Sequence, residues 1–299
     1  LGAVDYARGE FARARDHYDR ALKIREASLG PEHPHTASTL INLGNTALVL
    51  GDHATAREYY ARALQIQEKV LGPNHPNVAY SLTNLGLVLL NEDKARESLP
   101  YYERALQIRE QAFGPENPDV AHNLDDLGEI QAELGELPAA FANQLRALKI
   151  REKTLGAEHP LVARSLYNLG QTLTRLRRFS EAHERLAQAL KIREKTLGEN
   201  HPDIAQCLIA EVQLELDAGE DAVAAAERAL QIRSSSEVVK EDVYEAQLLL
   251  ARALLARKPV DRARARELAV AARDGYASLD AATFAAETAK AEALLAKLR

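Results

Sequence analysis

The sequence of 299 residues is poor in several residue types that particular protein classes need. Its single cysteine excludes a disulfide framework and any metal site built mainly from cysteine. Tryptophan and methionine are absent and aromatic residues make up only 5%, so the apolar content rests on alanine and leucine, which favour helix. No apolar run approaches the roughly 18 residues typical of a membrane-spanning helix.

The chain also lacks an excess of positive charge. It has 38 Lys and Arg against 44 Asp and Glu, which gives a formal net charge of −6. Nucleic acids and anionic membranes attract basic surfaces, so we expect neither as a partner. The basic stretch from Arg252 to Arg266 has no aromatic residues on which bases would stack, and we interpret it as a solvated turn between helices. We expect a cytoplasmic protein.

Motifs of common catalytic and cofactor sites are missing as well. There is no phosphate-binding loop, no Gly-rich dinucleotide fingerprint and no Gly-x-Ser-x-Gly elbow. His183-Glu184 lacks the second histidine of the zinc-protease pattern, and Cys207 stands where small polar residues stand at equivalent positions. We therefore predict no enzyme activity, no cofactor and no metal site.

What the sequence does have is an internal repeat. Segments similar to Leu29-Gly30-Pro31-Glu32-His33-Pro34, each with one or two substitutions, follow four more times at a constant step of 42 residues, with the glycine at positions 30, 72, 114, 156 and 198. The residues between these landmarks vary freely, which argues against low complexity. Such a period is typical of a solenoid, in which stacked units bury what one unit cannot bury alone.

Each repeat contains two helical patterns. In residues 34–50, Ala37, Leu40 and Leu43 recur at the helical spacing, and the proline at 34 suits a first helical turn. A second helix is predicted from about residue 53 to 71, and Gly72 is expected to end it in the left-handed conformation. Over the whole chain we predict thirteen or fourteen helices and no sheet.

Three residues depart from the repeat. Pro100 lies inside a predicted second helix, where it removes one backbone hydrogen bond and is expected to bend or delay the helix. Asp93 and Arg177 replace the glycine that stands at the turn between the two helices of other repeats. These two turns therefore need not be left-handed.

At this point the sequence resembles a known family. Leu43-Gly44, Ala56, Tyr60 and Ala63 match the tetratricopeptide repeat pattern, and the added length with the Leu-Gly-Pro-x-His-Pro turn is similar to the kinesin-light-chain type. The resemblance covers residues 1 to about 233. It implies an all-α fold, a right-handed superhelical solenoid of antiparallel helix pairs whose first helices line a concave face.

We predict one solenoid over residues 1–299. It is divided into a truncated first repeat (1–33), four clear repeats (34–75, 76–117, 118–159 and 160–201), a weaker repeat (202–236), a degenerate helix pair (237–280) and a capping helix (281–299). Because Leu1-Gly2 aligns with Leu43-Gly44, we expect a fragment that opens inside a helix. The arrangement resembles the C-terminal repeat arrays of bacterial multidomain regulators such as serine/threonine kinases.

The histidines before the helix-opening prolines could suggest a ladder of metal ligands. They stand at positions 33, 75, 159 and 201. Packed helices lie about 10 Å apart, whereas a metal needs donors about 2 Å away, so neighbouring histidines cannot share an ion. Asn117 takes the fourth place, and we therefore interpret the histidine as a turn residue that precedes a helix.

A second stripe on the first helices faces away from the predicted core. Asn42, Asn84 and Asn168, with Asp126 between them, recur on it one repeat apart, and an asparagine amide can both donate to and accept from a peptide backbone. The predicted groove residues are Ser38, Asn42, Asn45, Tyr80, Asn84, Asn91, His122, Asp125, Asp126, Glu129, Glu133, Arg164, Tyr167, Asn168, Gln171 and Arg175.

Two interpretations of this stripe stay open. The asparagines either hold an extended ligand or brace the neighbouring helix. The acidic unit around Asp126 and the basic unit around Arg164 either recognise a bipolar ligand or pair with each other across the repeat boundary. We predict a non-catalytic protein-interaction module that binds a peptide or a partner protein in its groove. The alternatives are a regulatory or sensor region that acts on an upstream domain of the same protein, and a structural spacer.

Overall fold

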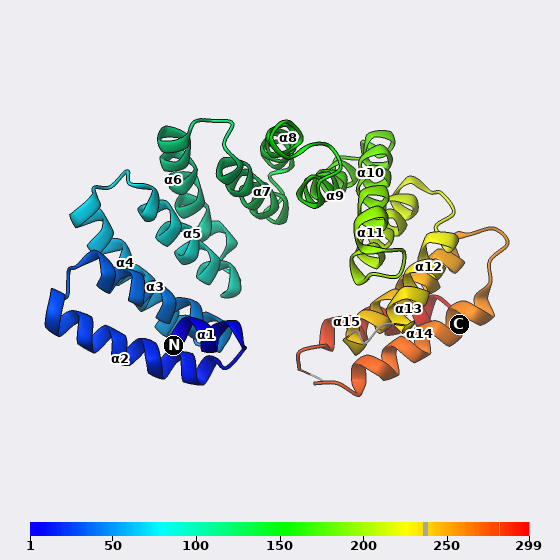
Figure 1. The fold of residues 1–299 in the computed structure, drawn as a ribbon. Coiled ribbons are helices and arrows are strands. Elements are labelled where there is room, and N and C mark those ends of the chain that lie inside the picture. The colour runs from blue at the N-terminus through cyan, green and yellow to red at the C-terminus, as the bar shows by residue number, and fades with distance from the viewer. Residues whose placement is uncertain (236–238, 281, 299) are drawn as a thin grey trace. The chain divides into compact units, whose positions relative to one another are not determined.

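The computed structural model describes residues 1–235, 239–280 and 282–298. These residues form fifteen α-helices and no strand, which confirms the all-α prediction (Figure 1). The expected number of thirteen or fourteen was too low. The chain opens inside a short helix, α1 (Gly2–Ala7), as expected, and α1 packs on the next helix.

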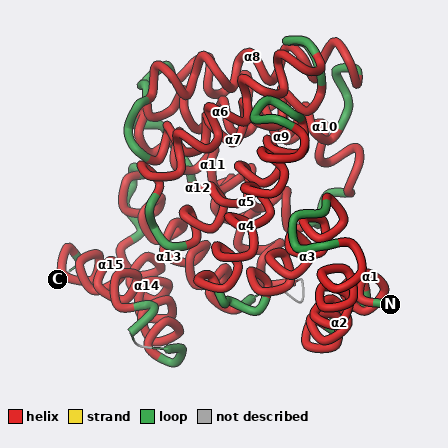
Figure 2. The backbone as a smooth tube through the Cα atoms, turned by 90° about the vertical axis from the view of Figure 1, so that its left-hand side faces the viewer, coloured by secondary structure: helices red, strands yellow, loops and turns green. Residues whose placement is uncertain are grey.

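The helices are joined by short loops (Figure 2) and fall into two compact units, residues 1–150 and 151–299. The unit boundary lies within α8 (Leu137–Leu155). The other helices of the first unit are α2 (Phe11–Leu29), α3 (Pro34–Val49), α4 (His53–Leu71), α5 (Pro76–Asn91), α6 (Ala95–Phe113) and α7 (Pro118–Glu133). Those of the second unit are α9 (Pro160–Arg175), α10 (Phe179–Leu197), α11 (Pro202–Ala218), α12 (Val223–Ser235), α13 (Lys240–Ala256), α14 (Arg262–Ala277) and α15 (Ala285–Lys297).

Within each unit, successive helices pack against each other and alternate between two sides. In the first unit α3, α5 and α7 lie on one side and α2, α4 and α6 on the other (Figure 1). In the second unit α9, α11 and α13 lie on one side and α10, α12 and α14 on the other. We call the side of each unit that is formed by the odd-numbered helices its odd-helix face, and the opposite side its even-helix face.

The turn histidines are helix N-caps. The Nδ1 atom of His75 accepts a hydrogen bond of 3.1 Å from the backbone N–H of Asn77, and His33, His159 and His201 do the same at their own helices. Asn117 uses its Oδ1 atom in the same way, at 2.8 Å from the backbone nitrogen of Asp119. The turn interpretation is thus confirmed, and asparagine can replace histidine because it supplies an equivalent acceptor.

Three local predictions were wrong. Gly72 has a positive φ of 88°, but its ψ of 156° is extended rather than left-handed helical, a region open essentially to glycine alone. Asp93 and Arg177 adopt φ of 58° and 59°, so their turns keep the positive φ of the glycine turns. Pro100 does not delay α6, which starts at Ala95, the place equivalent to the start of α4, because proline removes a single donor there. A bend at Pro100 stays a prediction.

The two helices of a repeat meet at a glycine. A Cβ atom on Gly44 of α3 would lie 2.5 Å from the ring of Tyr60 of α4, and one on Gly86 of α5 would lie 2.5 Å from the ring of Tyr102 of α6. Such distances are too short for non-bonded carbon atoms. The Leu-Gly and aromatic positions of the motif are therefore one packing unit, in which the ring fills the space that glycine leaves open.

Successive repeats are linked by a buried polar contact that the pattern analysis missed. Near the end of a second helix, Arg25 donates to Thr39 Oγ1 at 2.6 Å and to the carbonyl oxygen of His35 at 2.8 Å, both on the next first helix. Arg151, which is 2% exposed, donates in the same way to Ser165 Oγ at 2.7 Å. Equivalent pairs are Gln67 with Ser81, Arg109 with Asn123, and Arg193 with Cys207.

The C-terminal part of the second unit shares one apolar cluster. Residues of α11, α12, α13 and α14 contribute to it, and Ala291 and Leu294 of α15 pack against them. The predicted repeat boundary at 236 and 237 and the predicted capping-helix bounds at 281 and 299 lie outside the described residues.

Candidate functional site

The predicted groove residues all belong to first helices. α3, α5 and α7 carry those of the first unit, and α9 carries those of the second. Several are exposed, among them Tyr80, whose exposed fraction is 47%. Leu87, about two helical turns further along α5, is 38% exposed, so an apolar surface accompanies the polar side chains. The other exposed members are Ser38, Asn91, His122, Glu129, Glu133, Gln171 and Arg175.

The asparagine ladder does not lie fully on the exposed stripe, and this expectation was wrong for two of its members. Asn84 is 9% exposed and Asn168 is 7% exposed. The Nδ2 atom of Asn84 is enclosed and has no hydrogen-bond partner among the described residues. A first helix inside a stack packs against helices on both sides, as α5 does against α4 and α6, so its buried stripe is wider than that of a helix with one neighbour.

Other predicted residues brace the fold. The hydroxyl of Tyr60 donates to Asn45 Oδ1 at 2.7 Å and so ties α4 to α3. On α9 the Nε2 atom of Gln171 donates to the hydroxyl of Tyr167 at 2.9 Å. Bracing is thus shown for Asn45, whereas ligand binding by exposed side chains such as Tyr80 stays a prediction.

The face of α7 is acidic. His122 Nε2 lies 3.7 Å from Asp126 Oδ2 on the same helix, and Asp125 is fully buried beside them. Burial raises the pKa of Tyr102, and the nearby carboxylates of Asp126 and Glu129 raise it further. Pairing of Arg164 or Arg175 with Asp126 or Glu129 would join residues of the two units and stays a prediction.

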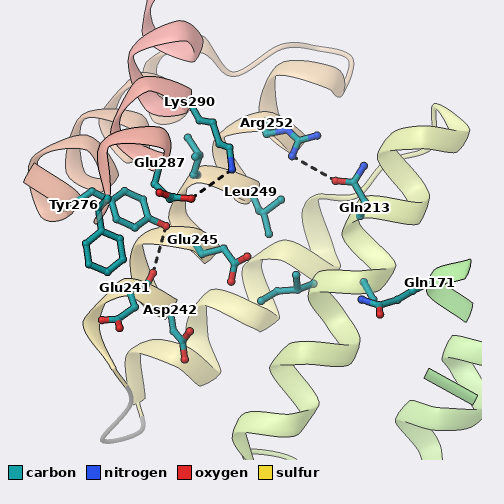
Figure 3. A pocket seen from close by; sticks show the side chains of 14 residues that line it. Gln171, Gln213, Glu241, Asp242, Glu245, Leu249, Arg252, Tyr276, Glu287 and Lys290 are labelled. Carbon is teal, nitrogen blue, oxygen red and sulfur yellow. Dashed lines mark hydrogen bonds and ion pairs between the residues drawn. The ribbon is translucent and has the colours of Figure 1, made fainter. Parts of the chain in front are cut away.

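The second unit has a cavity on its odd-helix face that the sequence did not reveal. Its volume is about 470 Å³, and its walls come from α9, α11, α13 and α15 together with Tyr276 of α14 and Phe284 (Figure 3). Gln171 and Gln213 continue the predicted stripe into this cavity. Its remaining polar lining residues are Glu241, Asp242, Glu245, Arg252, Glu287 and Lys290.

The cavity was missed because its residues lie in the degenerate part of the repeat. Glu241, Asp242 and Glu245 occupy the first turns of α13, a place where acidic residues usually interact with the helix dipole and solvent. The only sequence signal is the spacing of Glu241 and Glu245, which places two carboxylates on one side of a helix.

Features that would indicate other chemistry have structural explanations. Burial raises the pKa of Cys207 to about 11, although Arg193 opposes the shift, so the thiol stays protonated and is a poor nucleophile. The described residues contain no group of three or more His, Cys, Asp or Glu side chains that could hold a metal ion. No helix in the described ranges is long and apolar enough to cross a membrane.

Several solved structures share this fold at low sequence identity. The putative kinesin light chain repeats of Podosopora anserina share 22% identity with a TM-score of 0.60, over 69% of this chain and 99% of that chain. BtubC (BKLC) of P. vanneervenii shares 22% identity with a TM-score of 0.63, over 76% of this chain and 89% of that chain. A signal transduction ATPase with a tetratricopeptide repeat sensor from Pyrococcus horikoshii shares 17% identity with a TM-score of 0.73, over 100% of this chain and 43% of that one.

No curated protein matches the sequence. Family models are decisive instead: a tetratricopeptide repeat model matches residues 1–53, 44–94, 82–153 and 127–195, and a second one matches residues 167–237. Together with the glycine–aromatic contacts and the paired helices, these matches show that the chain belongs to the tetratricopeptide repeat family.

Proposed function

We propose that this chain is a non-catalytic protein-interaction module of the cytoplasm, which binds a peptide segment or a partner protein on its odd-helix face. The observation that carries the proposal is the cavity of about 470 Å³ on that face of the second unit. It combines apolar residues such as Leu249 with convergent polar groups, the composition expected of a binding site.

Polar side chains on the even-helix face pair with one another. On the even-helix face, ion pairs join successive second helices: Arg62 to Glu26 at 2.5 Å and Arg104 to Glu68 at 2.6 Å. On the odd-helix face, Tyr80 and Leu87 expose apolar surface, as Ile24 and Val70 do on second helices, so the cavity and not apolar exposure singles out the odd-helix face. Exposed aromatic and aliphatic side chains beside polar groups are typical of a surface that binds a protein.

Site-specific photo-crosslinking tests this function. A photoreactive benzoylphenylalanine replaces Gln213 on α11 in one variant and Arg185 on α10, on the even-helix face, in a second. Both variants are irradiated in extract of the source cells and the crosslinked proteins are identified by mass spectrometry. We expect a partner that is crosslinked from position 213 and not from position 185.

The alternatives give different patterns. A regulatory region that acts on an upstream domain crosslinks within the full-length protein from position 213. A structural spacer gives no crosslink that depends on the face. Equal capture from positions 213 and 185 contradicts the proposed function, because it reports contact without a preferred face.

A further inference from the structure

The cavity of the second unit has an acidic wall that the protein neutralises only in part. Asp242 accepts a hydrogen bond from the buried Arg233, and Glu287 Oε1 lies 3.6 Å from Lys290 Nζ (Figure 3). Glu241 and Glu245 have no side-chain hydrogen bond or ion pair within the described part of the chain. Two carboxyl groups on neighbouring turns of α13 thus line the cavity without a hydrogen-bond or ion-pair partner among the described residues.

The environment of Glu245 disfavours its ionised form. Its pKa is raised, mainly because the surrounding protein displaces water from the carboxyl group. Arg233 and Lys290 oppose this shift, whereas Asp242 and Glu287 add to it. The side chain still contacts solvent, so the free-energy cost of ionising it is moderate. A positive group that enters the cavity would reduce that cost.

The remaining lining of the cavity is apolar and can contact the methylene groups of a side chain that ends in a positive group. Ile209, Leu248 and Leu249 supply apolar lining. The rings of Tyr276 and Phe284 are stacked with their centroids 5.8 Å apart and close one end. Arg252 lies away from this end and donates to Gln213 Oε1 at 3.5 Å, next to the stripe on which a peptide backbone would lie (Figure 3).

Resting on the proposed function, we infer that this cavity is the pocket for an arginine side chain of the bound segment. A guanidinium group carries five donors in a planar fork, so it can donate to the carboxylate of Glu245 or to that of Glu241 at the cavity wall. Its three methylene groups would lie along the apolar lining. An acidic side chain would face the same two carboxylates and would be rejected.

The probe is a random peptide library displayed on phage and selected against the whole chain. We expect the selected peptides to share an arginine. Replacing that arginine by citrulline, which has the same shape without the charge, should weaken binding about tenfold or more, the effect of losing a charge-assisted hydrogen-bond pair. Lysine at the same place should weaken it less than citrulline does.

The matched variants are Glu241→Gln with Glu245→Gln, and as a control Glu220→Gln with Glu267→Gln, which makes the same change of net charge outside the cavity. The first pair should weaken the arginine peptide about tenfold and leave the citrulline peptide unchanged. The control pair should leave both affinities unchanged. A melting curve of each variant verifies that it is folded.

The opposite results overturn the inference. Selected peptides without a basic residue, or a citrulline peptide that binds as tightly as its arginine parent, exclude an arginine pocket. The proposed function would survive if those peptides still crosslink to position 213. A selection that yields no peptide at all also counts against the pocket, and the crosslinking pattern from cell extract then decides the function by itself.

Discussion

At the scale of single residues, the first turns of α3, α5, α7, α9 and α11 each have one side-chain acceptor. His33, His75, His159 and His201 supply a ring nitrogen and Asn117 an amide oxygen, each to the backbone N–H two residues later. The sequence indicates this shared role, because asparagine replaces histidine at one of the five positions and both side chains carry a hydrogen-bond acceptor.

The cap gives the first prediction. His75→Asn should leave the free energy of unfolding within about 0.5 kcal/mol of the wild type, whereas His75→Ala should lower it by about 1 kcal/mol, because only asparagine keeps an acceptor for the N–H of Asn77. Urea denaturation followed by circular dichroism measures both values. Equal losses for the two variants would show that the ring acts through packing instead.

The second prediction concerns the turn at Arg177. Its φ of 59° is unfavourable for any residue with a Cβ atom, and its guanidinium lies 5.4 Å from the ring centre of Phe179. Arg177→Gly and Arg177→Ala both lose the guanidinium, so their comparison isolates the backbone. We expect the glycine variant to be more stable by about 1 kcal/mol in the same denaturation assay.

The equivalent turn of another repeat serves as a control. Gly135 has a φ of 80°, and Gly135→Ala should therefore cost a similar free energy. Identical stability of the glycine and alanine variants at position 177 would mean that the turn relaxes to a negative φ when the arginine is removed.

At the scale of helices, the buried link from a second helix to the next first helix holds neighbouring repeats in register. Arg193 of α10 is 9% exposed and donates to the carbonyl oxygen of Asp203 at 2.9 Å and to Cys207 Sγ at 3.4 Å. Its guanidinium also lies 4.8 Å from the ring centre of Tyr167. A hydrophobicity pattern does not reveal this link, because it treats arginine as a surface residue.

Another repeat suggests how to test the link. There the pair is Gln67 and Ser81, whose hydroxyl donates to Gln67 Oε1 at 2.7 Å. Arg193→Gln alone should lose about 2 kcal/mol, since a sulfur atom is a poor partner for an amide. Adding Cys207→Ser should restore about 1 kcal/mol by recreating the other repeat's pair. Strict additivity of the two changes in thermal unfolding would contradict a direct link.

α11 carries the carboxyl group of Glu215, whose ionised form is unfavourable in the folded state. Burial and the neighbouring Glu211 raise the pKa of Glu215 to about 7. His183 opposes this rise, whereas Glu220 and Asp221 add to it. One of its oxygens, Oε2, is enclosed without a hydrogen-bond partner among the described residues. His183 Nδ1 lies 3.9 Å from Glu211 Oε1, so α10 provides a weak counter-charge.

The pH dependence follows from this pKa. Between the ordinary value of 4.5 and about 7 the folded state binds more protons at Glu215 than the unfolded state does, so this residue lowers stability as the pH rises through that window. Glu215→Gln stays neutral and should therefore melt at a higher temperature than the wild type at about pH 8 and at a similar temperature at about pH 5.

An exposed glutamate on another helix provides the control for this experiment. Glu103→Gln on α6 should shift the melting temperature by the same small amount at both pH values. A Glu215→Gln gain of equal size at both pH values would assign the effect to packing rather than to charge.

At the scale of the whole molecule, the sequence predicts the features that recur in every repeat, but not the features that differ between repeats. The constant step of 42 residues, the Leu-Gly and aromatic positions and the helix-opening prolines predict the helix pairs and their order. The burial of Asn84 was not predictable from one helical pattern, because it depends on a neighbour on each side. The cavity was not predictable either, because it is formed where α13 and α15 depart from the repeat.

Hydrogen–deuterium exchange on the whole chain, with and without a peptide selected from the library, tests the central claim most directly. The account predicts slower exchange on binding in helices of the odd-helix face, first of all in α11 and α13, whose residues line the cavity. It predicts no change in the exposed turns of α10 and α12. Protection confined to the even-helix face, or spread equally over both faces, would contradict it.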